Sequence, residues 1–529
     1  MTNNQLARYF TRLARIMEFH GENFFKIKAY EAVADVLKKS DLDFSGMSGE
    51  ELEKIPGVGK AISEKIIEIY QTGNLKTLEK YLALYPPGIE DLLSIKGLGP
   101  KKVRQLWEEL GVCTPGELIY ACEENRLTSL KGFGEKTQED IKQKAAFFTA
   151  SKGLYLFSSI LPVAGRFVNL LSDHDESVLV GDLARRLPVV KGIELLTTLE
   201  MEEVRLMGRL SADEVPEFEG IPVFISSCNK ANFDIEQLKL TSSELFYSSA
   251  LDSLNNGHMT IKDILKKFEP YRRENSAHIH SKGQIYSPVA PEDIKGVIHV
   301  HTTYSDGSQS LASMAQHCID QGYKYLVVTD HSQSAIYANG LLPDRITDQW
   351  AEVDLLNTTM EDFTIFKGIE SDILSDGTLD YSQDLLSGFE CVIASVHSGL
   401  KMDSDKATER LIKAIENPFT RILGHPTGRL LLARSGYSPD MEKVLDACAA
   451  NNVAIEINSN PWRMDLDWIW YEKAFHKGLY LSINPDAHSL SGISDIKWGV
   501  MVAAKANINP DCILNKMSAA EFKNWLQSK

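Results

Sequence analysis

The sequence predicts a multidomain protein: an all-helical N-terminal part, a mixed α+β middle part and a C-terminal α/β barrel. Three observations lead to this fold class. The chain has 529 residues, more than a single hydrophobic core usually serves. Its first part repeats a short glycine pattern between helical segments. Its last part repeats short apolar runs that end in histidine, aspartate or glutamate.

Composition narrows the class of protein. Hydrophobic residues make up 43% and charged residues 24%, as in ordinary globular proteins. No apolar run approaches the ~20 residues that span a bilayer, and the N-terminus lacks a secretory apolar region, so we expect a cytoplasmic protein without a membrane partner. The seven cysteines are scattered without a C-x-x-C pair, which argues against a disulfide framework and a thiolate zinc site.

The net charge of −17 is unevenly distributed. Residues 1–150 carry 21 basic and 22 acidic side chains, whereas the remaining 379 residues carry 35 and 51. A nearly neutral N-terminal part can still bind phosphates through backbone amides. An acidic C-terminal part can hold metal ions, whose charge offsets its own.

The N-terminal part contains a threefold repeat at residues 52–66, 92–106 and 127–141. Each copy has an apolar lead-in, a G-x-G turn and a helix, whose first N–H groups are free to bind phosphate. One copy is more typical of two helices joined by ordinary glycine caps, but three copies favour phosphate binding. The candidate contacts are Gly57, Gly59, Lys60, Gly97, Gly99, Lys101, Lys102, Gly132 and Gly134.

These repeats resemble helix-hairpin-helix motifs, which hold the DNA backbone without reading sequence. The segments "NFFKIKAYEAVADVL" and "GVGKAISEKIIEIYQTGNLKTLEKY" also resemble the lyase-type domain of family X DNA polymerases. The resemblance implies that Lys65 can form a Schiff base with an abasic sugar. A helical lysine is ordinarily a solvated charge, and the lyase role requires a lowered pKa.

The middle part, residues 151–270, alternates strand-like and helical segments and resembles the palm and thumb of family X polymerases. The family's Gly-Ser-x-Arg-Arg turn reads "GDLARR" at residues 181–186, and its Thr-Gly-Ser turn reads "TSS". In this sequence Gly192 and Glu194 occupy the positions of the family's Asp-x-Asp pair, and Phe224 occupies the position of its third aspartate. Asp234 precedes the "TSS" turn, looks helical and is not assigned to catalysis. One carboxylate cannot hold the two metal ions of nucleotidyl transfer, so polymerase activity is predicted to be lost.

From residue 295, short apolar runs end in residues able to bind metal, and helical segments fall between several of them. Repeated βα units with chemistry at the strand ends predict a barrel related to the TIM type. A lone histidine at a strand end is ordinarily a satisfied polar group, but a convergent set predicts a metal site. The set is His299, His301, Asp306, His331, Glu370, His397, His425, Asp486 and His488.

The ligand types indicate the metal. Imidazole with carboxylate suits Zn²⁺, Mn²⁺ or Fe²⁺ better than Ca²⁺ or Mg²⁺. Nine ligands are too many for one ion and suit three, with a bridging carboxylate. No thiolate takes part, which favours an open, hydrolytic site over a closed structural one.

The motifs "HVHTTYSDG", "TDHS", "SVHS", "HPTGR" and "DAH" closely resemble the PHP (polymerase and histidinol phosphatase) family. The resemblance implies a distorted TIM-like barrel with a three-metal centre that hydrolyses phosphoesters. It departs at Pro485, where the family usually has threonine, and proline removes an N–H. The implied ligand sets are His299, His301, Glu370 and Asp486; Glu370, His397 and His425; and Asp306, His331 and His488.

Arg429 and Arg463 follow two of these motifs. Each is a candidate to clamp phosphate through bidentate bonds, and each is equally compatible with a structural ion pair.

The order of parts resembles bacterial family X DNA polymerases with a PHP domain. We expect a lyase-type helix-hairpin-helix domain at 1–90, a fingers-like helix-hairpin-helix region at 91–150, a degenerate palm and thumb at 151–270, a linker at 271–294 and a PHP phosphoesterase domain at 295–529. The first hypothesis is a DNA-repair 3′–5′ exonuclease that holds gapped or nicked DNA. The alternatives are an active gap-filling polymerase with an exonuclease and a non-catalytic repair scaffold; no obligate protein partner is inferred.

Overall fold

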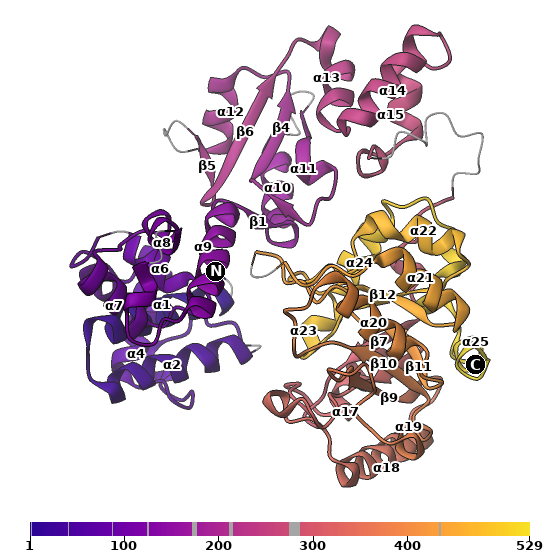
Figure 1. The fold of residues 1–529 in the computed structure, drawn as a ribbon. Coiled ribbons are helices and arrows are strands. Elements are labelled where there is room, and N and C mark those ends of the chain that lie inside the picture. Colours follow the sequence, from indigo (N-terminus) through magenta and orange to yellow (C-terminus); the bar gives the residue numbers. More distant parts are fainter. Residues whose placement is uncertain are drawn as a thin grey trace. The chain divides into compact units, whose positions relative to one another are not determined.

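The computed structural model describes residues 1, 3–40, 42–86, 88–123, 126–171, 177–210, 215–274, 286–432 and 435–528. The chain forms two compact units, Met1–Lys152 and Gly153–Lys529 (Figure 1). Among the described residues, no helix is both long and apolar enough to cross a membrane.

The first unit is helical throughout its described residues. Its apolar positions recur at helical spacing, and the buried ones, such as Phe10, Leu37 and Ile66, form one core. The helices are α1 (Asn3–His20), α2 (Phe24–Lys39), α3 (Gly49–Leu52), α4 (Lys60–Thr72), α5 (Lys76–Leu82), α6 (Gly88–Ser94), α7 (Pro100–Leu110), α8 (Pro115–Glu123), η1 (Arg126–Ser129) and α9 (Glu135–Ser151).

The second unit opens with a small α+β region. Its four-stranded sheet has the order β2-β4-β6-β5, and β1 pairs with β3. The strands are β1 (Tyr155–Leu156), β2 (Ser177–Leu179), β3 (Val189–Val190), β4 (Ile193–Thr197), β5 (Glu217–Phe218) and β6 (Ile221–Ser227). The helices are α10 (Phe157–Leu171), α11 (Gly181–Ala184), α12 (Met201–Gly208), η2 (Lys230–Asn232), α13 (Phe233–Leu240), α14 (Glu244–Asn255), α15 (Ile261–Lys267) and η3 (Pro270–Arg272).

The rest of the second unit is a barrel of seven parallel strands in the order β7 to β13. A bridge between Val300, the last residue of β7, and Ala487, just beyond β13, brings the two edge strands together. The strands are β7 (Gly296–Val300), β8 (Tyr325–Val328), β9 (Thr364–Asp372), β10 (Cys391–Ser395), β11 (Thr420–Leu423), β12 (Ala454–Asn458) and β13 (Leu481–Asn484).

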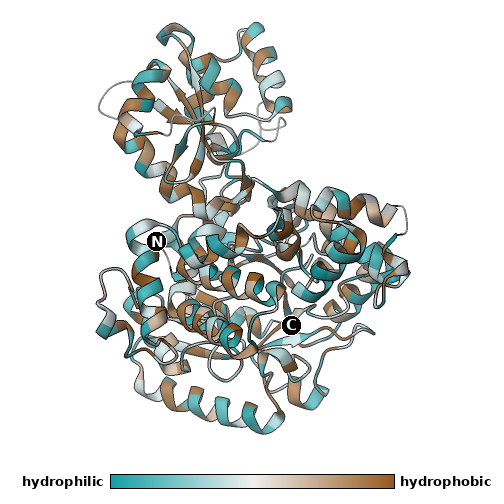
Figure 2. Cartoon of the chain, turned by 90° about the vertical axis from the view of Figure 1, so that its left-hand side faces the viewer, coloured by the Kyte–Doolittle hydropathy of each residue, from teal (hydrophilic) through white to brown (hydrophobic). Residues whose placement is uncertain are grey.

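Helices cover the barrel, so nearly every strand residue is buried, as expected for a parallel sheet covered on both faces. Figure 2 shows hydrophobic and hydrophilic residues alternating along the helices, as expected of amphipathic segments that cover a core. The helices are η4 (Pro291–Asp293), α17 (Leu311–Asp320), η5 (Ile336–Ala338), α18 (Pro343–Thr359), α19 (Gln383–Leu386), α20 (Ser404–Ile415), α21 (Met441–Ala450), η6 (Trp468–Trp470), α22 (Tyr471–His476), α23 (Leu490–Ile493), α24 (Ile496–Ala503), η7 (Pro510–Cys512), η8 (Leu514–Lys516) and α25 (Ala519–Leu526).

The predicted fold class is confirmed: a helical first part, an α+β region and an α/β barrel follow one another along the chain. None of the seven cysteines, all of which lie at described positions, forms a disulfide. In a parallel barrel the carboxyl ends of the strands meet at one face, so residues that end different strands are brought together there.

Gly368 of β9 tests the packing between neighbouring barrel strands. A Cβ there would lie 2.5 Å from the Val328 carbonyl oxygen and 2.8 Å from Cγ1 of Val327, so Gly368→Ala should lower the stability of the second unit by about 1–3 kcal/mol. The control is Gly165→Ala in α10, where a Cβ meets no atom within 4 Å and alanine favours the helix. Thermal unfolding should show a lower Tm for Gly368→Ala alone; equal Tm values would contradict the barrel packing.

Candidate metal centre

The nine predicted ligands lie together at the carboxyl-terminal face of the barrel. Each belongs to the end of a strand or to the loop that follows it, and different strands supply different members. Four overlapping groups of side chains each bring ligand atoms within 4.8 Å of one another. They are His301, Asp306, His331 and His488; His299, His301 and Asp486; His299, Glu370 and His425; and His331, Glu370 and His397.

Glu370, on β9, occupies the middle of the centre. Its carboxylate is fully buried, and five imidazole rings from other parts of the barrel face it. The distances from its oxygens are 2.9 Å to Nδ1 of His331, 2.9 Å to Nε2 of His425, 3.2 Å to Nε2 of His299, 3.2 Å to Nε2 of His397 and 3.6 Å to Nε2 of His301. A carboxylate that faces ligands on several sides is the geometry of a bridging metal ligand.

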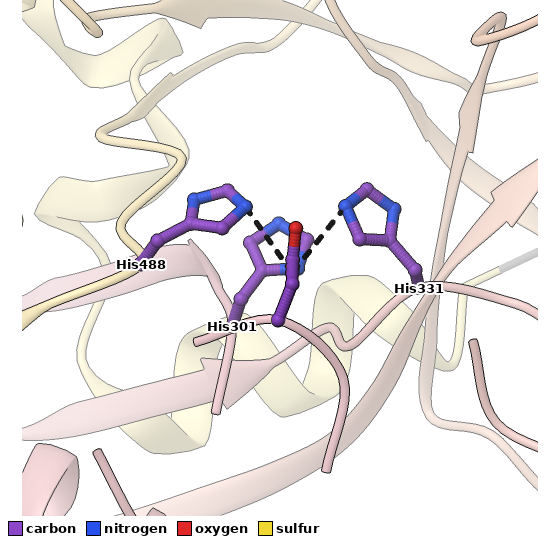
Figure 3. A group of neighbouring side chains, drawn as sticks. His301, His331 and His488 are labelled. Atoms are coloured by element: carbon purple, nitrogen blue, oxygen red, sulfur yellow. Dashed lines mark ion pairs between the residues drawn. The ribbon is translucent and has the colours of Figure 1, made fainter. Parts of the chain in front are cut away.

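A second cluster surrounds Asp306. Its Oδ1 lies 3.4 Å from Nε2 of His488, 3.7 Å from Nε2 of His331 and 3.8 Å from Nδ1 of His301. Figure 3 shows the three labelled rings gathered around one carboxylate, with dashed ion pairs. The ring of His301 stacks on that of His488, with centroids 4.1 Å apart. His301 thus lies between this cluster and the one formed with His299 and Asp486.

The backbone at the first histidine pair differs from plain strand alternation. The pairing of β7 with β8 shifts register between Ile298 and Val300, and His299 has a φ of 70°. The strand ends at Val300, so His301 belongs to the following loop. The ring centroids of His299 and His301 are 5.3 Å apart. This local irregularity, more than their spacing of two residues along a strand, brings the two rings together.

Two further ligand positions adopt unusual backbone angles, a φ of 23° at His425 and 51° at Asp486. Such angles cost free energy in residues with a Cβ and persist where surrounding structure enforces them, often at functional sites. Pro485, the departure from the PHP pattern, precedes Asp486. The segment is still held, because His301 N donates to the Ala487 carbonyl at 2.9 Å and Ala487 N donates to the His299 carbonyl at 3.2 Å.

The donor atoms fit metal ions. Buried polar atoms are normally hydrogen-bonded, yet ligand atoms at this face have no hydrogen-bond partner among the described residues. They are Nε2 of His299, both ring nitrogens of His301, Nδ1 of His331, Oε2 of Glu370, Nε2 of His397 and Nδ1 of His425. Nitrogen and carboxylate donors in this combination suit Zn²⁺, Mn²⁺ or Fe²⁺.

The electrostatics of the centre favour cations. Burial alone would raise the pKa of Glu370, but His397 and the other imidazoles hold it well below its usual value. Burial lowers the pKa of His397, yet Glu370 raises it to about 10. Burial, with His488 and His331 nearby, lowers the pKa of His301 to about 3. Because metal ligands must be deprotonated, cation binding at this centre would release protons.

Two carboxylates that the sequence analysis did not single out orient the ligands. Oε1 of Glu456 lies 2.5 Å from Nδ1 of His299, and its Oε2 accepts from the backbone N of His425 at 2.6 Å. Asp372 hydrogen-bonds Nδ1 of His397. A carboxylate on the far nitrogen of a histidine fixes the ring and raises its basicity as a ligand. The sequence does carry a signal for both carboxylates: Glu456 lies inside the apolar run "VAIEIN", and Asp372 follows two residues after Glu370.

Asp330 shapes the loop that carries Asp306. It is fully buried and accepts hydrogen bonds from the backbone N and Oγ1 of Thr302, both at 2.7 Å, from Ser305 and from the Gln349 amide. Burial raises the pKa of its carboxyl, although the hydrogen bonds from Ser305 and Thr302 act to lower it. This network fixes the turn between His301 and Asp306.

The two candidate arginines differ in their contacts. Arg463 Nε lies 3.1 Å from Oδ2 of Asp486, and its buried Nη1 has no hydrogen-bond partner among the described residues. Arg429 donates to the carbonyls of Arg463 and Met464 and, at 2.9 Å, to Oδ2 of Asp467. Arg463 therefore keeps a donor at the centre, whereas three nitrogens of Arg429 bind the neighbouring loop.

The α+β region places the polymerase-like positions on its sheet. Glu194 on β4 and Phe224 on β6 are register partners in parallel strands. Oε2 of Glu194 accepts from the backbone N of Asp182 at 2.8 Å, and burial raises the pKa of Glu194. Asp234 lies in α13. Within the described ranges, none of the four candidate metal groups lies in this region.

The three glycine turns of the first unit share one geometry. Gly57, Gly97 and Gly132 have φ between 86° and 91°, which glycine adopts without strain. In each turn the second glycine is the N-cap of α4, α7 or α9 and provides no side-chain cap. The amides at these helix starts are therefore not bound by a cap side chain.

The lysines follow the same turns. Lys60, Lys101 and Lys102 occupy the first turns of α4 and α7, and Nζ of Lys102 lies 5.6 Å from the ring centroid of Phe133. Lys65, the lyase candidate, lies on α4 and donates to the Ala61 carbonyl at 3.3 Å.

Known families match three parts of the chain. Residues 1–75 match the helix-hairpin-helix domain, residues 89–146 the SAM-like helix-hairpin-helix tandem, and residues 298–460 the PHP domain. A probable phosphatase of Thermoanaerobacter sp. (strain X514) is 28% identical over 235 residues, covering 40% of this chain and 93% of that one. A probable phosphatase of Caldanaerobacter subterraneus subsp. tengcongensis is 26% identical over 250 residues, covering 44% and 90%.

One relative aligns along the full length. The DNA polymerase/3'-5' exonuclease PolX of Bacillus subtilis (strain 168) is 30% identical over 569 aligned positions, which cover 100% of both chains. The order of the helix-hairpin-helix and PHP matches agrees with the order of the structural parts. The chain therefore belongs to the PolX family, bacterial family X polymerase-like proteins with a C-terminal PHP domain.

Proposed function

We propose that this chain is a DNA-repair phosphoesterase whose barrel removes nucleotides from 3′ ends with the help of three divalent ions, Mn²⁺, Zn²⁺ or Fe²⁺. The observation that carries the proposal is the Glu370 carboxylate, with five imidazole rings within 3.6 Å. The names of the full-length relative, an exonuclease, and of the shorter relatives, phosphatases, support hydrolysis of phosphoesters.

The nine residues would hold the ions, with Glu370 shared between two of them. Two members have divided places. His301 contacts both Asp486 at 3.2 Å and Asp306 at 3.8 Å, and His331 contacts both Glu370 at 2.9 Å and Asp306 at 3.7 Å. When bound, the ions would supply an activated water and neutralise phosphate charge. Arg463, with its free Nη1, would donate to a phosphate oxygen, and Arg429 would hold the loop that carries Arg463.

The reaction is addition of water across the terminal phosphodiester. A bond forms between the water oxygen and phosphorus, and the bond from phosphorus to the 3′ oxygen of the preceding nucleotide breaks. The leaving 3′ oxygen gains a proton, the terminal nucleotide departs as a 5′-monophosphate, and a new 3′ hydroxyl remains.

We further propose that the palm-like region no longer adds nucleotides. Its one remaining carboxylate, Glu194, binds the α11 backbone. Both arginines of the adjacent turn are engaged within the chain: Arg185 forms two hydrogen bonds to Glu274, at 2.8 and 2.7 Å, and Arg186 lies 3.6 Å over the Tyr271 ring. Lys505 Nζ donates to the Arg185 carbonyl at 2.6 Å. Primer extension with dNTPs and Mn²⁺ tests this, since robust extension would favour the alternative of an active polymerase.

The hairpins would hold gapped or nicked DNA through its backbone. The amides that follow Gly59 and Gly99 begin helices with lysine in the first turn, whereas α9 begins with Glu135, whose charge opposes a phosphate. The first two hairpins would therefore bind phosphate more strongly than the third. Lys65 stays a lyase candidate, and a non-catalytic scaffold is disfavoured because unsatisfied buried ligand atoms cost free energy without a bound cation.

His397→Ala removes one of the ligands that face Glu370. Loss of a residue that merely orients a ligand typically costs roughly 10–100-fold in activity, so loss of the ligand itself should lower 3′-end hydrolysis by more than this. Binding to a 5′-labelled gapped duplex should stay unchanged. His317→Ala on α17, outside the centre, is the control. Full nuclease activity of purified His397→Ala protein would refute the metal-site assignment.

Glu456→Gln removes the charge that orients His299 and should weaken Mn²⁺ affinity about 10–100-fold. The matched control is Glu390→Gln, whose carboxylate accepts from Lys367 N at 2.9 Å just before β10, away from the centre. Calorimetric titration of metal-free protein with Mn²⁺ measures this without any activity. Equal affinities of the two variants would show that Glu456 has no positioning role.

Replacing Lys60 and Lys101 together by alanine should weaken DNA binding and flatten its salt dependence. Log affinity falls linearly with log salt, and each lost phosphate contact makes the slope of this fall less steep by about 0.9. Lys443→Ala on the barrel helix α21 should leave the slope unchanged. Fluorescence anisotropy at several salt concentrations measures it, and an unaltered slope in the double variant would exclude these hairpins as the phosphate contacts.

A further inference from the structure

The short turn η5 displays two large hydrophobic side chains to solvent beside the metal centre. Ile336 is 86% exposed and Tyr337 is 71% exposed. The turn comes five residues after His331, one of the ligands. Exposed apolar side chains next to a polar site are typical of ligand-contact positions.

The exposure does not come from a loose loop. Leu341 N donates to the His331 carbonyl at 2.8 Å. Ser334 N donates to the Asp380 carboxylate at 2.6 Å, and Ser334 Oγ donates to Asp372 Oδ2 at 2.9 Å. At Gly340 a Cβ would lie 1.9 Å from the Ser332 carbonyl oxygen, so the loop is closed tightly on itself. Binding residues are commonly carried by loops that a rigid scaffold holds in position.

The Tyr337 ring lies against the ligand histidines. Its centroid is 6.1 Å from that of His331 and 6.5 Å from that of His397. The base and the 5′ phosphate of one nucleotide are attached to the same sugar. A nucleotide whose phosphate lies at the centre can therefore place its base at this adjacent ring, where bases stack readily on aromatic side chains.

We propose that Tyr337 is the stacking platform for the base of the 3′-terminal nucleotide that the barrel releases. The inference rests on the proposed function and names its substrate class, a nucleic-acid strand end with an intact base, in place of a small phosphomonoester. Base–aromatic stacking needs no particular base, because every base has a π face. This suits an enzyme that removes nucleotides one after another regardless of sequence. Tyr337 is thus a specificity residue, while the ligand set performs the hydrolysis.

The test compares two 5′-labelled strands, identical except that one ends in a normal nucleotide and the other in an abasic tetrahydrofuran nucleotide. With Mn²⁺, Tyr337→Ala should lose about 10-fold in kcat/KM on the normal end, the size of one stacking contact. On the abasic end it should lose less than about twofold, since no base is present to stack. Tyr337→Phe, which keeps the ring, should match the parent protein on both ends.

The control is Leu355→Ala, which removes another exposed hydrophobic side chain, on α18, and should change neither rate. Equal losses of Tyr337→Ala on both ends, or no loss on either, would overturn the stacking role. Failure of the proposed function looks different: the parent protein would then release nucleotides from neither strand. Mn²⁺ binding by Tyr337→Ala, measured by calorimetry, should equal that of the parent, and a loss of metal would also overturn the proposal.

Discussion

The carboxylate of Glu370 faces five imidazole rings in the mouth of the barrel, and the rest of the site depends on this arrangement. Burying a charge is costly unless it is paired or coordinates a metal. Here the partners come from strands far apart in sequence, so only a folded barrel assembles them. Ring orientation then requires further carboxylates, which Glu456 and Asp372 provide behind His299 and His397. One buried negative charge thus explains the five histidines that face it and the carboxylates behind two of them.

The barrel also stabilises strained backbone at the same place. His299, His425 and Asp486 all have positive φ, and each such residue costs on the order of 1–3 kcal/mol. The parallel strands are buried almost throughout, and a continuous ladder of strand pairs holds their ends in position. Three of the nine ligands are thus among the residues with positive φ, and the apolar core stabilises this backbone where ligand geometry must be fixed. The palm-like sheet shows the opposite: its remaining carboxylate and its arginines are used in internal contacts.

Strand-end position made the ligands predictable. His397 and His425 each follow a short apolar run, and parallel strands bring such ends together whatever their sequence separation. Glu456 and Asp372 were missed because they lie within strands, Glu456 inside β12 and Asp372 at the end of β9, and read as isolated polar residues. The bulge at His299 depends on pairing with β8, and the bonds of Arg429 depend on a loop 34 residues later; neither is visible in one sequence. The exposure of Tyr337 likewise follows from how its turn is tied down.

In the proposed function, the barrel carries out the hydrolysis, the hairpins bind DNA, and the palm-like region does neither. Incubation of 5′-labelled gapped DNA with the purified full chain and Mn²⁺, with and without dNTPs, tests this assignment most directly. Progressive shortening of the labelled strand from its 3′ end is expected in both reactions. Lengthening of that strand when dNTPs are present would contradict it, because the palm-like region would then be adding nucleotides.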